Sequence, residues 1–328
     1  MPYCDAFNRP IEYLRISVTD RCNLRCVYCM PEEGVPPLSH AEVLTYEEIA
    51  RLARVIVGLG LSKLRVTGGE PLVRKGIDQL IELLAAIPGV EDLSMTTNGI
   101  LLAGMADRLA EAGLRRVNIS LDSLRPERFH AMTRRGQLED VLAGIAAADR
   151  AGLRPVKINV VVIRGLNDDE TLDFAERTVT DGWNVRFIEV MPLAPDPRWA
   201  SDGYVPSEEI RRRIEAHFGP LQAVDGQGAG PARYYRIEGA PGSVGFISPI
   251  SEHFCFRCNR LRLTANGQLL PCLMSEQGID VRSALRSGAS DDELRALVVQ
   301  AIGAKPAGHH LGTVARGPGA TPMSRIGG

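Results

Sequence analysis

The sequence predicts an α/β fold: an incomplete, six-stranded (β/α)6 barrel followed by a small C-terminal module. Up to about residue 191, short runs rich in aliphatic residues alternate with amphipathic helical stretches, the pattern of a parallel sheet with helices outside. A closed eight-stranded barrel normally needs about 250 residues and two more units, so six units predict a barrel that stays incomplete. The six strands are expected at 14–18, 64–67, 93–96, 117–121, 156–163 and 185–190.

The helical pattern is clearest over residues 45–57. Thr45 and Glu48 have the spacing of a capping box, in which each side chain bonds the backbone N–H of the other residue. Apolar residues then recur at helical spacing and form one face for packing against the sheet. That face consists of Ile49, Leu52, Ala53 and Ile56.

Polar and glycine-rich residues follow the expected strands. Ligands of parallel α/β folds bind where the strands end, at their carboxyl ends. We therefore expect the chemistry of this protein to be gathered on one rim of the barrel. The residues concerned are Thr19 with the cysteine-containing loop that follows it, and segments 68–71, 97–99, 122–123 and 191–192.

Composition indicates a globular enzyme of 328 residues, 45% of them hydrophobic, with a net charge of −2. This charge argues against general attraction to nucleic acid or membranes, so an anionic substrate must be held by a local group of cations. The sequence has no apolar run of membrane-spanning length and no signal peptide, which predicts a cytoplasmic protein. We expect a barrel core at 1–192, a connecting segment rich in Pro, Gly and polar residues at 193–232, and a C-terminal module at 233–328.

Seven cysteines are present, and six of them form two close groups, which suits reduced thiolates on metal better than a disulfide framework. The first group, Cys22, Cys26 and Cys29, has the spacing C-x3-C-x2-C with no fourth cysteine nearby. Three thiolates on a four-iron cubane leave one iron open to a small molecule. A structural zinc site, or a ferredoxin-type cluster with a remote fourth ligand, is the alternative.

The second group is Cys255, Cys258 and Cys272, again with three members. A zinc ribbon completed by His253 or by Cys4 is the alternative interpretation here. Arginines crowd the same region at positions 257, 260 and 262. Although arginines near loops are usually solvated, residues 260 and 262 on a strand would point to one face, where two guanidinium groups suit phosphate oxygens.

The first cysteine loop, followed by Thr67-Gly68-Gly69-Glu70-Pro71, resembles the radical S-adenosylmethionine (SAM) enzymes. Alone, the glycine pair is also typical of an ordinary strand-to-helix turn. The resemblance implies a [4Fe-4S] cluster whose open iron binds the amino and carboxylate groups of the methionine. It also implies that the Gly-Gly-Glu element holds the methionine amino group.

Further motifs make the resemblance specific to the GTP 3′,8-cyclase family, which performs the first step of molybdenum cofactor biosynthesis. The motifs are Asp5-x-Phe7-x-Arg9, and segments 14–20, 65–72, 186–189, 245–249, 254–264 and 326–328. The resemblance implies a lyase in which a 5′-deoxyadenosyl radical removes hydrogen from C3′ of GTP. The ribose radical then attacks C8 of guanine, and reduction gives 3′,8-cyclo-7,8-dihydro-GTP.

The same resemblance implies the site residues and the partners. Two [4Fe-4S] clusters are expected, the first on Cys22, Cys26 and Cys29, and the second, which binds guanine, on Cys255, Cys258 and Cys272. SAM contacts are expected at Tyr28, Gly69, Ser120 and Met191. GTP contacts are expected at Arg15, Arg65, Thr96, Lys157, Arg260, Leu261 and Arg262. The terminal Gly327 and Gly328 are expected to reach into the active site, against the alternative of a disordered end.

An external low-potential electron donor, a cyclic pyranopterin synthase as the downstream enzyme and a homodimer complete the expected partners. Two other function classes stay open at this point. A radical SAM enzyme that modifies peptides would share the first motif and could use the second cluster as an auxiliary electron carrier, but it would not need the phosphate-binding arginines. A non-catalytic metal protein, either a zinc-stabilised scaffold or an electron carrier, is the third possibility.

Overall fold

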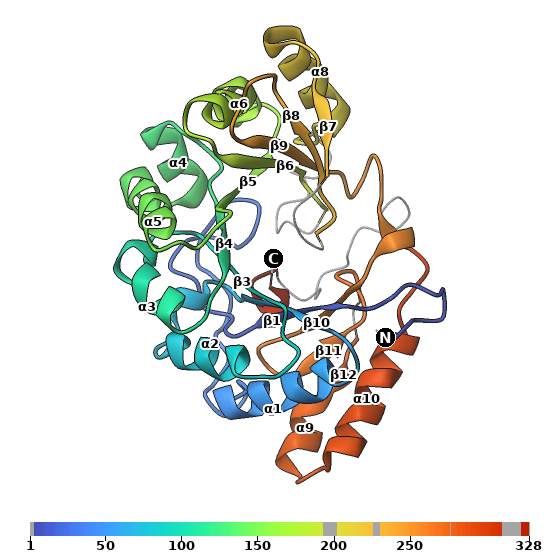
Figure 1. The fold of residues 1–328 in the computed structure, drawn as a ribbon. Helices are drawn as coiled ribbons and strands as arrows, with labels where there is room; N and C mark the ends of the chain where they lie inside the picture. Colours follow the sequence, from blue (N-terminus) through green and yellow to red (C-terminus); the bar gives the residue numbers. More distant parts are fainter. Residues whose placement is uncertain (1–2, 193–201, 226–229, 276, 310–322, 328) are drawn as a thin grey trace.

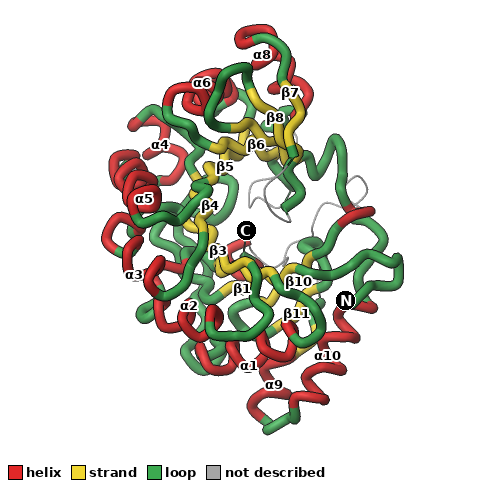
Figure 2. The backbone as a smooth tube through the Cα atoms, viewed as in Figure 1, coloured by secondary structure: helices red, strands yellow, loops and turns green. Residues whose placement is uncertain are grey.

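In the computed structural model, residues 3–192, 202–225, 230–275, 277–309 and 323–327 are described (Figure 1). All six predicted strands are confirmed to within one or two residues. They alternate with helices that lie on the outside of the curved sheet, as Figure 2 shows. The strands are β1 (Tyr13–Ser17), β2 (Lys63–Thr67), β3 (Asp92–Thr97), β4 (Arg116–Ser120), β5 (Lys157–Val162) and β6 (Asn184–Glu189). The outer helices are α1 (Tyr46–Val57), α2 (Ile77–Ala85), α3 (Ala106–Glu111), α4 (Pro126–Thr133), α5 (Leu138–Arg150) and α6 (Thr171–Thr180).

The second half of the chain continues the same sheet at both edges. Strand β10 (Arg260–Leu263) pairs in parallel with β1, and β9 (Ser243–Ile247) pairs in parallel with β6. Eight parallel strands therefore stand side by side, with antiparallel β11 and β12 beyond β10, and antiparallel β8 and β7 beyond β9. The remaining elements are α8 (Ser207–Phe218), β7 (Gln222–Val224), β8 (Arg233–Arg236), β9 (Ser243–Ile247), β10 (Arg260–Leu263), β11 (Gln268–Leu270), β12 (Ile279–Asp280), α9 (Val281–Arg286), α10 (Asp291–Gly303) and α11 (Met323–Ile326).

The barrel is open, because the two ends of the sheet are β12 and β7. Figure 1 shows the gap between these ends, and it places the C-terminus inside the ring of strands. The sequence predicted six βα units and a small module. The structure confirms the units and adds that the module supplies a parallel strand to each edge of their sheet. No helix in the described part of the chain is both long and apolar enough to cross a membrane.

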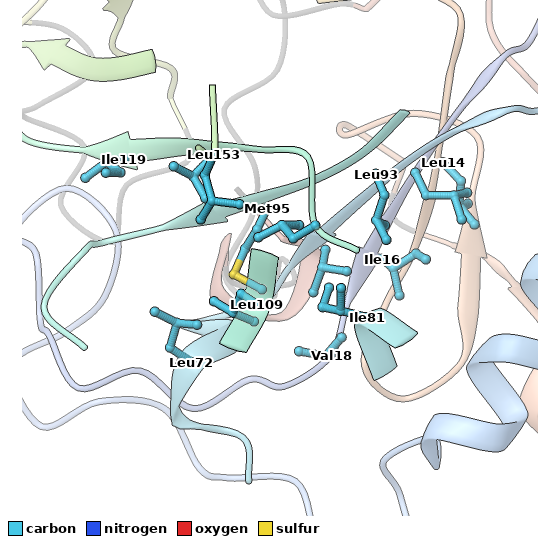
Figure 3. Close-up of a cluster of buried hydrophobic side chains, with 14 of the residues drawn as sticks. Leu14, Ile16, Val18, Leu72, Ile81, Leu93, Met95, Leu109, Ile119 and Leu153 are labelled. Carbon is cyan, nitrogen blue, oxygen red and sulfur yellow. The ribbon is translucent and has the colours of Figure 1, made fainter. Parts of the chain in front are cut away.

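Side chains alternate strictly between the two faces of the sheet, as the pleat of a strand requires. Leu14 and Ile16 of β1 and Leu93 and Met95 of β3 belong to the hydrophobic core between sheet and helices, where Figure 3 shows them beside Ile81 of α2. The residues between them point to the other face, into the barrel. This alternation places apolar residues under the helices and polar residues inside.

The capping box expected at Thr45 is confirmed. The Thr45 N–H donates to Oε2 of Glu48 at 2.7 Å, and the Glu48 N–H donates to Oγ1 of Thr45 at 3.2 Å. Such a cap stabilises a helix by about 0.5–2 kcal/mol. The predicted apolar face of α1 is buried against the sheet.

Candidate active site

A cavity of about 350 Å³ occupies the inside of the barrel, a volume suited to a small-molecule ligand. It brings together most of the residues that the sequence singled out. Both cysteine groups contribute to it, together with the ends of the strands and the arginines of β1, β2 and β10. The predicted residues that line it are Arg15, Cys22, Cys26, Tyr28, Cys29, Arg65, Gly69, Thr96, Ser120, Met191, Cys255, Cys258, Arg260, Arg262 and Cys272.

Two predicted GTP contacts lie elsewhere. Lys157 at the start of β5 is 3% exposed, and its Nζ lies 5.2 Å from the ring centroid of Tyr234. Leu261 is fully buried in the hydrophobic core, because it alternates with the inward-facing Arg260 and Arg262 on β10. The Leu261 side chain therefore faces away from the cavity, and only its backbone is available for a ligand.

The first cysteine loop is fixed by bonds to neighbouring segments. The N–H groups of Arg25 and Val27 donate to carbonyl oxygens of α4, each at 3.0 Å. Asn98, which follows β3, donates to Oδ1 of Asn23 at 2.8 Å and lies 3.9 Å from Sγ of Cys22. These bonds position the three thiols on one side of the cavity.

Burial strongly affects these thiols. It raises the pKa of Cys22 to about 11 and that of Cys29 to about 12, and it raises the pKa of Cys26 as well. A protein environment of this kind does not stabilise three thiolates by itself. Bound iron would stabilise them, since a coordinating metal deprotonates the thiol outright. Three convergent, partly buried cysteines therefore suit an iron–sulfur cluster as the resident group.

Gly69 lets the loop after β2 pack directly on the cysteine loop. Its N–H donates to the carbonyl oxygen of Thr19 at 2.7 Å, and the next N–H, that of Glu70, donates to the carbonyl of Arg21 at 2.8 Å. A Cβ at position 69 would overlap the Arg21 carbonyl oxygen. Only glycine fits this approach, and Gly69 lines the cavity beside the cysteines.

The Glu70 carboxylate ties the ends of β2 and β3 together. It accepts bonds from the N–H of Leu72 at 3.0 Å, from the hydroxyl of Thr97 at 2.8 Å and from the N–H of Asn98 at 2.6 Å. Burial raises its pKa to about 7, although these bonds favour the ionised form. Glu70 thus shapes the rim beside the first cysteine loop.

Asp122 lies in the cavity wall and was expected on the rim of the barrel, but without a specific role. The Tyr28 hydroxyl donates to its Oδ2 at 2.6 Å, and the N–H of Val161 donates to its Oδ1 at 2.8 Å. Burial raises the pKa of Asp122 to about 6 and also raises that of Tyr28. The pair fixes the Tyr28 ring at the cavity wall, where SAM contacts are expected.

The second cysteine group differs from the first in its charge environment. Burial raises the pKa of Cys258, but the charges of Arg260 and Lys305 outweigh burial and lower it to about 6. Cys255 has a raised pKa, chiefly through burial. The guanidinium of Arg260 lies 3.6 Å from Sγ of Cys258, so this group is built to hold a thiolate beside a cation.

The structure gives no support to a zinc ribbon on these cysteines. His253 is exposed and packs edge-on against the ring of His309, and Cys4 is exposed in a bridge with Pro10. Within the described ranges, no three His, Cys, Asp or Glu side chains form a group that could hold a metal ion. Cysteines that each bind a different iron of one cluster do not need such close approach.

Buried cations surround the cavity. Burial is the main reason that the pKa of Arg65 and that of Arg262 fall to about 10 and that the pKa of Arg15 falls well below its usual range, with further lowering by neighbouring arginines. Burial and the charges of Arg186, Arg116 and Arg65 lower the pKa of Lys157 to about 7. Buried charges are normally paired, so this arrangement calls for a multiply charged anion.

Arg186 is a cation of this group that the sequence analysis quoted in a motif but assigned no role. It lies on β6, is 4% exposed, and lines the cavity with its Nε buried and without a hydrogen-bond partner. A signal was present in the sequence. A charged residue between Val185 and Phe187, both core residues, must face the inside of the barrel.

The C-terminal tail enters the barrel. Arg262 donates from Nη1 to the carbonyl oxygen of Gly327 at 2.7 Å. Gly327 has a φ of +77°, and a Cβ there would overlap the hydroxyl of Thr67. Met323, at the start of α11, lines the cavity. Gly328 lies outside the described residues.

Comparison with known proteins first defines the broad class to which this protein belongs. Residues 16–178 match the family described as the Radical SAM superfamily, and residues 183–311 match the family described as Molybdenum Cofactor Synthesis C. The fold resembles that of Streptococcus suis SuiB bound to S-adenosylmethionine, with a TM-score of 0.61 and 13% identity over 88% of this chain and 68% of that chain. The fold and the cysteine loop are those of a radical SAM protein.

Curated relatives then define the family within this class. The GTP 3′,8-cyclase of Moorella thermoacetica is 54% identical over 99% of both chains. Those of Pelotomaculum thermopropionicum, 52% identical over 94% of this chain and 95% of the relative, and of Thermodesulfovibrio yellowstonii, 51% identical over 99% of both, are similar to a comparable extent. The chain belongs to the GTP 3′,8-cyclase family.

Proposed function

We propose that this protein is a radical SAM lyase that converts GTP to 3′,8-cyclo-7,8-dihydro-GTP, the first step of molybdenum cofactor biosynthesis. The observation that carries the proposal is the content of one cavity: two sets of three cysteines together with a group of buried arginines. One set suits a cluster that activates SAM, and the arginines suit a triphosphate. Membership of the family agrees with both assignments.

The residues of the chain have separable tasks in this reaction. Cys22, Cys26 and Cys29 would hold the first cluster, which with SAM would supply the 5′-deoxyadenosyl radical. We assign Tyr28, Gly69, Ser120 and Met191 to SAM binding. The bond between Tyr28 and Asp122 holds the Tyr28 ring in place, and Gly69, which lines the cavity, lets the loop after β2 pack against the cysteine loop.

Most of the residues that we assign to GTP binding carry a positive charge. We assign Arg15, Arg65, Thr96, Lys157, Arg260 and Arg262 to GTP binding, and Leu261 through its backbone. Forked guanidinium groups bind phosphate oxygens in pairs, and their burial excludes water from the ribose, where the hydrogen is removed. The second cluster, on Cys255, Cys258 and Cys272, is assigned to the guanine.

Gly327 and Gly328 are assigned to completing the site. The bond from Arg262 to the Gly327 carbonyl supports this assignment, because it fixes the tail beside a guanidinium that we assign to GTP. Gly327 also packs next to Thr67, a cavity-lining residue at the end of β2.

A radical SAM enzyme that modifies peptides is the less favoured alternative. Its substrate would not need a set of desolvated arginines, whereas a triphosphate would. The family relationship also favours the cyclase.

Partners and location form part of the proposal. A low-potential electron donor outside this chain reduces the first cluster. A cyclic pyranopterin synthase takes the product as the downstream enzyme. We further propose that the protein is a cytoplasmic homodimer.

Cysteine variants test this division of tasks. Replacing Cys22, Cys26 or Cys29 with alanine is expected to abolish SAM cleavage. Cys272→Ala is expected to leave some uncoupled SAM cleavage while cyclised nucleotide disappears. Anaerobic assays of 5′-deoxyadenosine and of nucleotide products measure both. Equal loss of both products in the two groups would show that the tasks are not divided in this way.

A further inference from the structure

The motif Asp5-x-Phe7-x-Arg9 has no role in the site described above. Arg9 is nevertheless 5% exposed, and it forms an ion pair with Asp5 at 2.6 Å. The Asp5 carboxylate also accepts the N–H groups of Phe7 and Arg9, at 2.9 and 3.0 Å. The motif is therefore a compact turn whose carboxylate fixes the Arg9 guanidinium in one orientation.

The guanidinium of Arg9 donates to three carbonyl oxygens of distant segments. Its Nη1 donates to the carbonyl of Cys255 at 2.6 Å and to that of Ala307 at 3.0 Å, and its Nη2 donates to the carbonyl of Pro306 at 2.7 Å. Arg9 thus joins the backbone of one cysteine of the second group to the segment that follows α10.

Lys305 joins the other two cysteines to that same segment. It is 3% exposed, and its Nζ donates to the carbonyls of Arg260 and Pro271, both at 2.8 Å. Arg260 lies two residues after Cys258, and Pro271 directly precedes Cys272. In the part of the chain that the structure describes, Lys305 forms no ion pair with a carboxylate.

Segment 305–307 is therefore tied to the backbone of Cys255 through Arg9, and to the backbone within two residues of Cys258 and Cys272 through Lys305. Burying a cation costs several kcal/mol unless its charge and its donors are compensated. Carbonyl oxygens satisfy the donors of Lys305 but do not neutralise its charge. A [4Fe-4S] core on three thiolates is an anion overall, and it would supply the missing negative charge.

We propose that Arg9 and Lys305 are positioning residues for the second cluster: through segment 305–307 they set the spacing of Cys255, Cys258 and Cys272, and Lys305 offsets the charge of the cluster. The inference rests on the proposed function for the presence of a cluster at these cysteines. It assigns no contact with GTP or SAM to either residue.

The experiment isolates the second cluster by using a parent in which Cys22, Cys26 and Cys29 are all alanine. After anaerobic reconstitution, iron in this parent reports on the second group alone. Lys305→Met and Arg9→Gln are compared with Arg154→Gln, which removes an exposed arginine paired with Asp149 on the outside of the barrel. The readouts are the rate of iron loss to a chelator, the reduction potential, and the melting temperature of the iron-free protein.

Lys305→Met is expected to lose iron at least about ten-fold faster than the parent, since groups that orient metal ligands contribute about 10–100-fold to affinity. Its remaining cluster is expected to have a more negative reduction potential, because a nearby positive charge has gone. Lys305→Arg keeps the positive charge, so we expect it to restore the reduction potential. We expect it to restore the slow loss of iron less completely. Arg9→Gln is expected to speed iron loss with a smaller change in potential, and Arg154→Gln to change neither.

Unchanged iron retention and potential in Lys305→Met would overturn the proposal. A lower melting temperature of the iron-free protein with unchanged cluster properties would overturn it as well, because both residues would then only stabilise the fold. If either variant does not fold, Arg9→Lys, which keeps the charge but cannot reach three carbonyls, provides the same comparison. Failure of the parent to bind iron would contradict the proposed function, so the two failures are distinguishable.

Discussion

Lys157 shows how a single residue indicates the charge of the ligand that the cavity would bind. It is buried at the start of β5, and desolvation together with Arg186, Arg116 and Arg65 lowers its pKa to about 7. An ammonium among arginines loses its proton easily because the negative charge of Asp92 only partly offsets burial and the neighbouring positive charges. A bound triphosphate would reverse that balance and return the proton.

This reversal predicts that GTP binding takes up a proton above pH 7. The empty site holds Lys157 largely neutral there, whereas the occupied site favours the charged form, so affinity must fall as pH rises from about 7 to 9. One such group gives up to about ten-fold weaker binding per pH unit. Titration calorimetry in two buffers of different ionisation enthalpy measures the proton uptake.

Lys157→Met is the matched control for that measurement. It is expected to bind GTP more weakly at pH 7 and to lose most of the pH dependence up to pH 9. The triphosphate itself is nearly fully ionised above about pH 7.5, since the last phosphate pKa is close to 6, and so adds little slope. Proton release on binding, or an affinity that rises with pH, would contradict this interpretation of the cation group.

Gly69→Ala tests the contact between the loop after β2 and the cysteine loop. The new Cβ would overlap a backbone oxygen, that of Arg21, which cannot rotate away. Displacement of either loop by about 1 Å is expected to lower SAM cleavage about 100-fold. Gly104→Ala, at a position with no atom within 4 Å of the added Cβ, is the control. Normal cleavage in Gly69→Ala would show that the contact is not required.

At the scale of elements, the period-two alternation of the strands was enough to predict much of the site. It placed Arg260 and Arg262 on one face, whereas Arg15 was expected from the family resemblance. Followed consistently, the alternation would have added Arg186. It also shows why Leu261 faces the core between two site residues. Alternation assigns a face but says nothing of depth, which is why it could not distinguish Arg65, at the cavity, from Lys157 behind it.

The tail is the element whose task is most directly testable. Gly327→Val is expected to reduce GTP cyclisation at least about 100-fold while both clusters keep their iron, because a side chain at this positive φ would overlap Thr67. Gly288→Val controls for backbone strain: its φ is +83°, and no atom lies within 4 Å of the added Cβ. Parallel assays of iron content and of cyclised nucleotide measure the difference. Equal activity in the two variants would exclude a role for the tail.

At the scale of the whole molecule, the sheet unites the two halves of the chain. Periodicity predicted six strands but not that β10 would pair with β1 and β9 with β6, since pairing across such sequence distances leaves no local pattern. The carbonyl bonds of Arg9 and Lys305 were hidden from sequence analysis for the same reason. The division at 1–192, 193–232 and 233–328 remains a proposal about functional parts.

Truncation tests how far those parts depend on one another. A chain of residues 1–192 would expose the hydrogen-bonding edges of β1 and β6, which β10 and β9 cover in the whole protein. Exposed edges of this length promote association between chains. We expect this fragment to aggregate and to melt without a cooperative transition. A soluble, monomeric fragment with a sharp melting curve would show that the barrel core folds alone.

The central claim is that one cavity brings SAM, GTP and both clusters together for removal of the C3′ hydrogen. The most direct test is anaerobic turnover of the reconstituted protein with SAM, a reductant and GTP deuterated at C3′, followed by mass analysis of both products. Deuterium in 5′-deoxyadenosine, together with a cyclised nucleotide, is the predicted result. Deoxyadenosine without deuterium would leave a radical SAM enzyme whose substrate is not GTP.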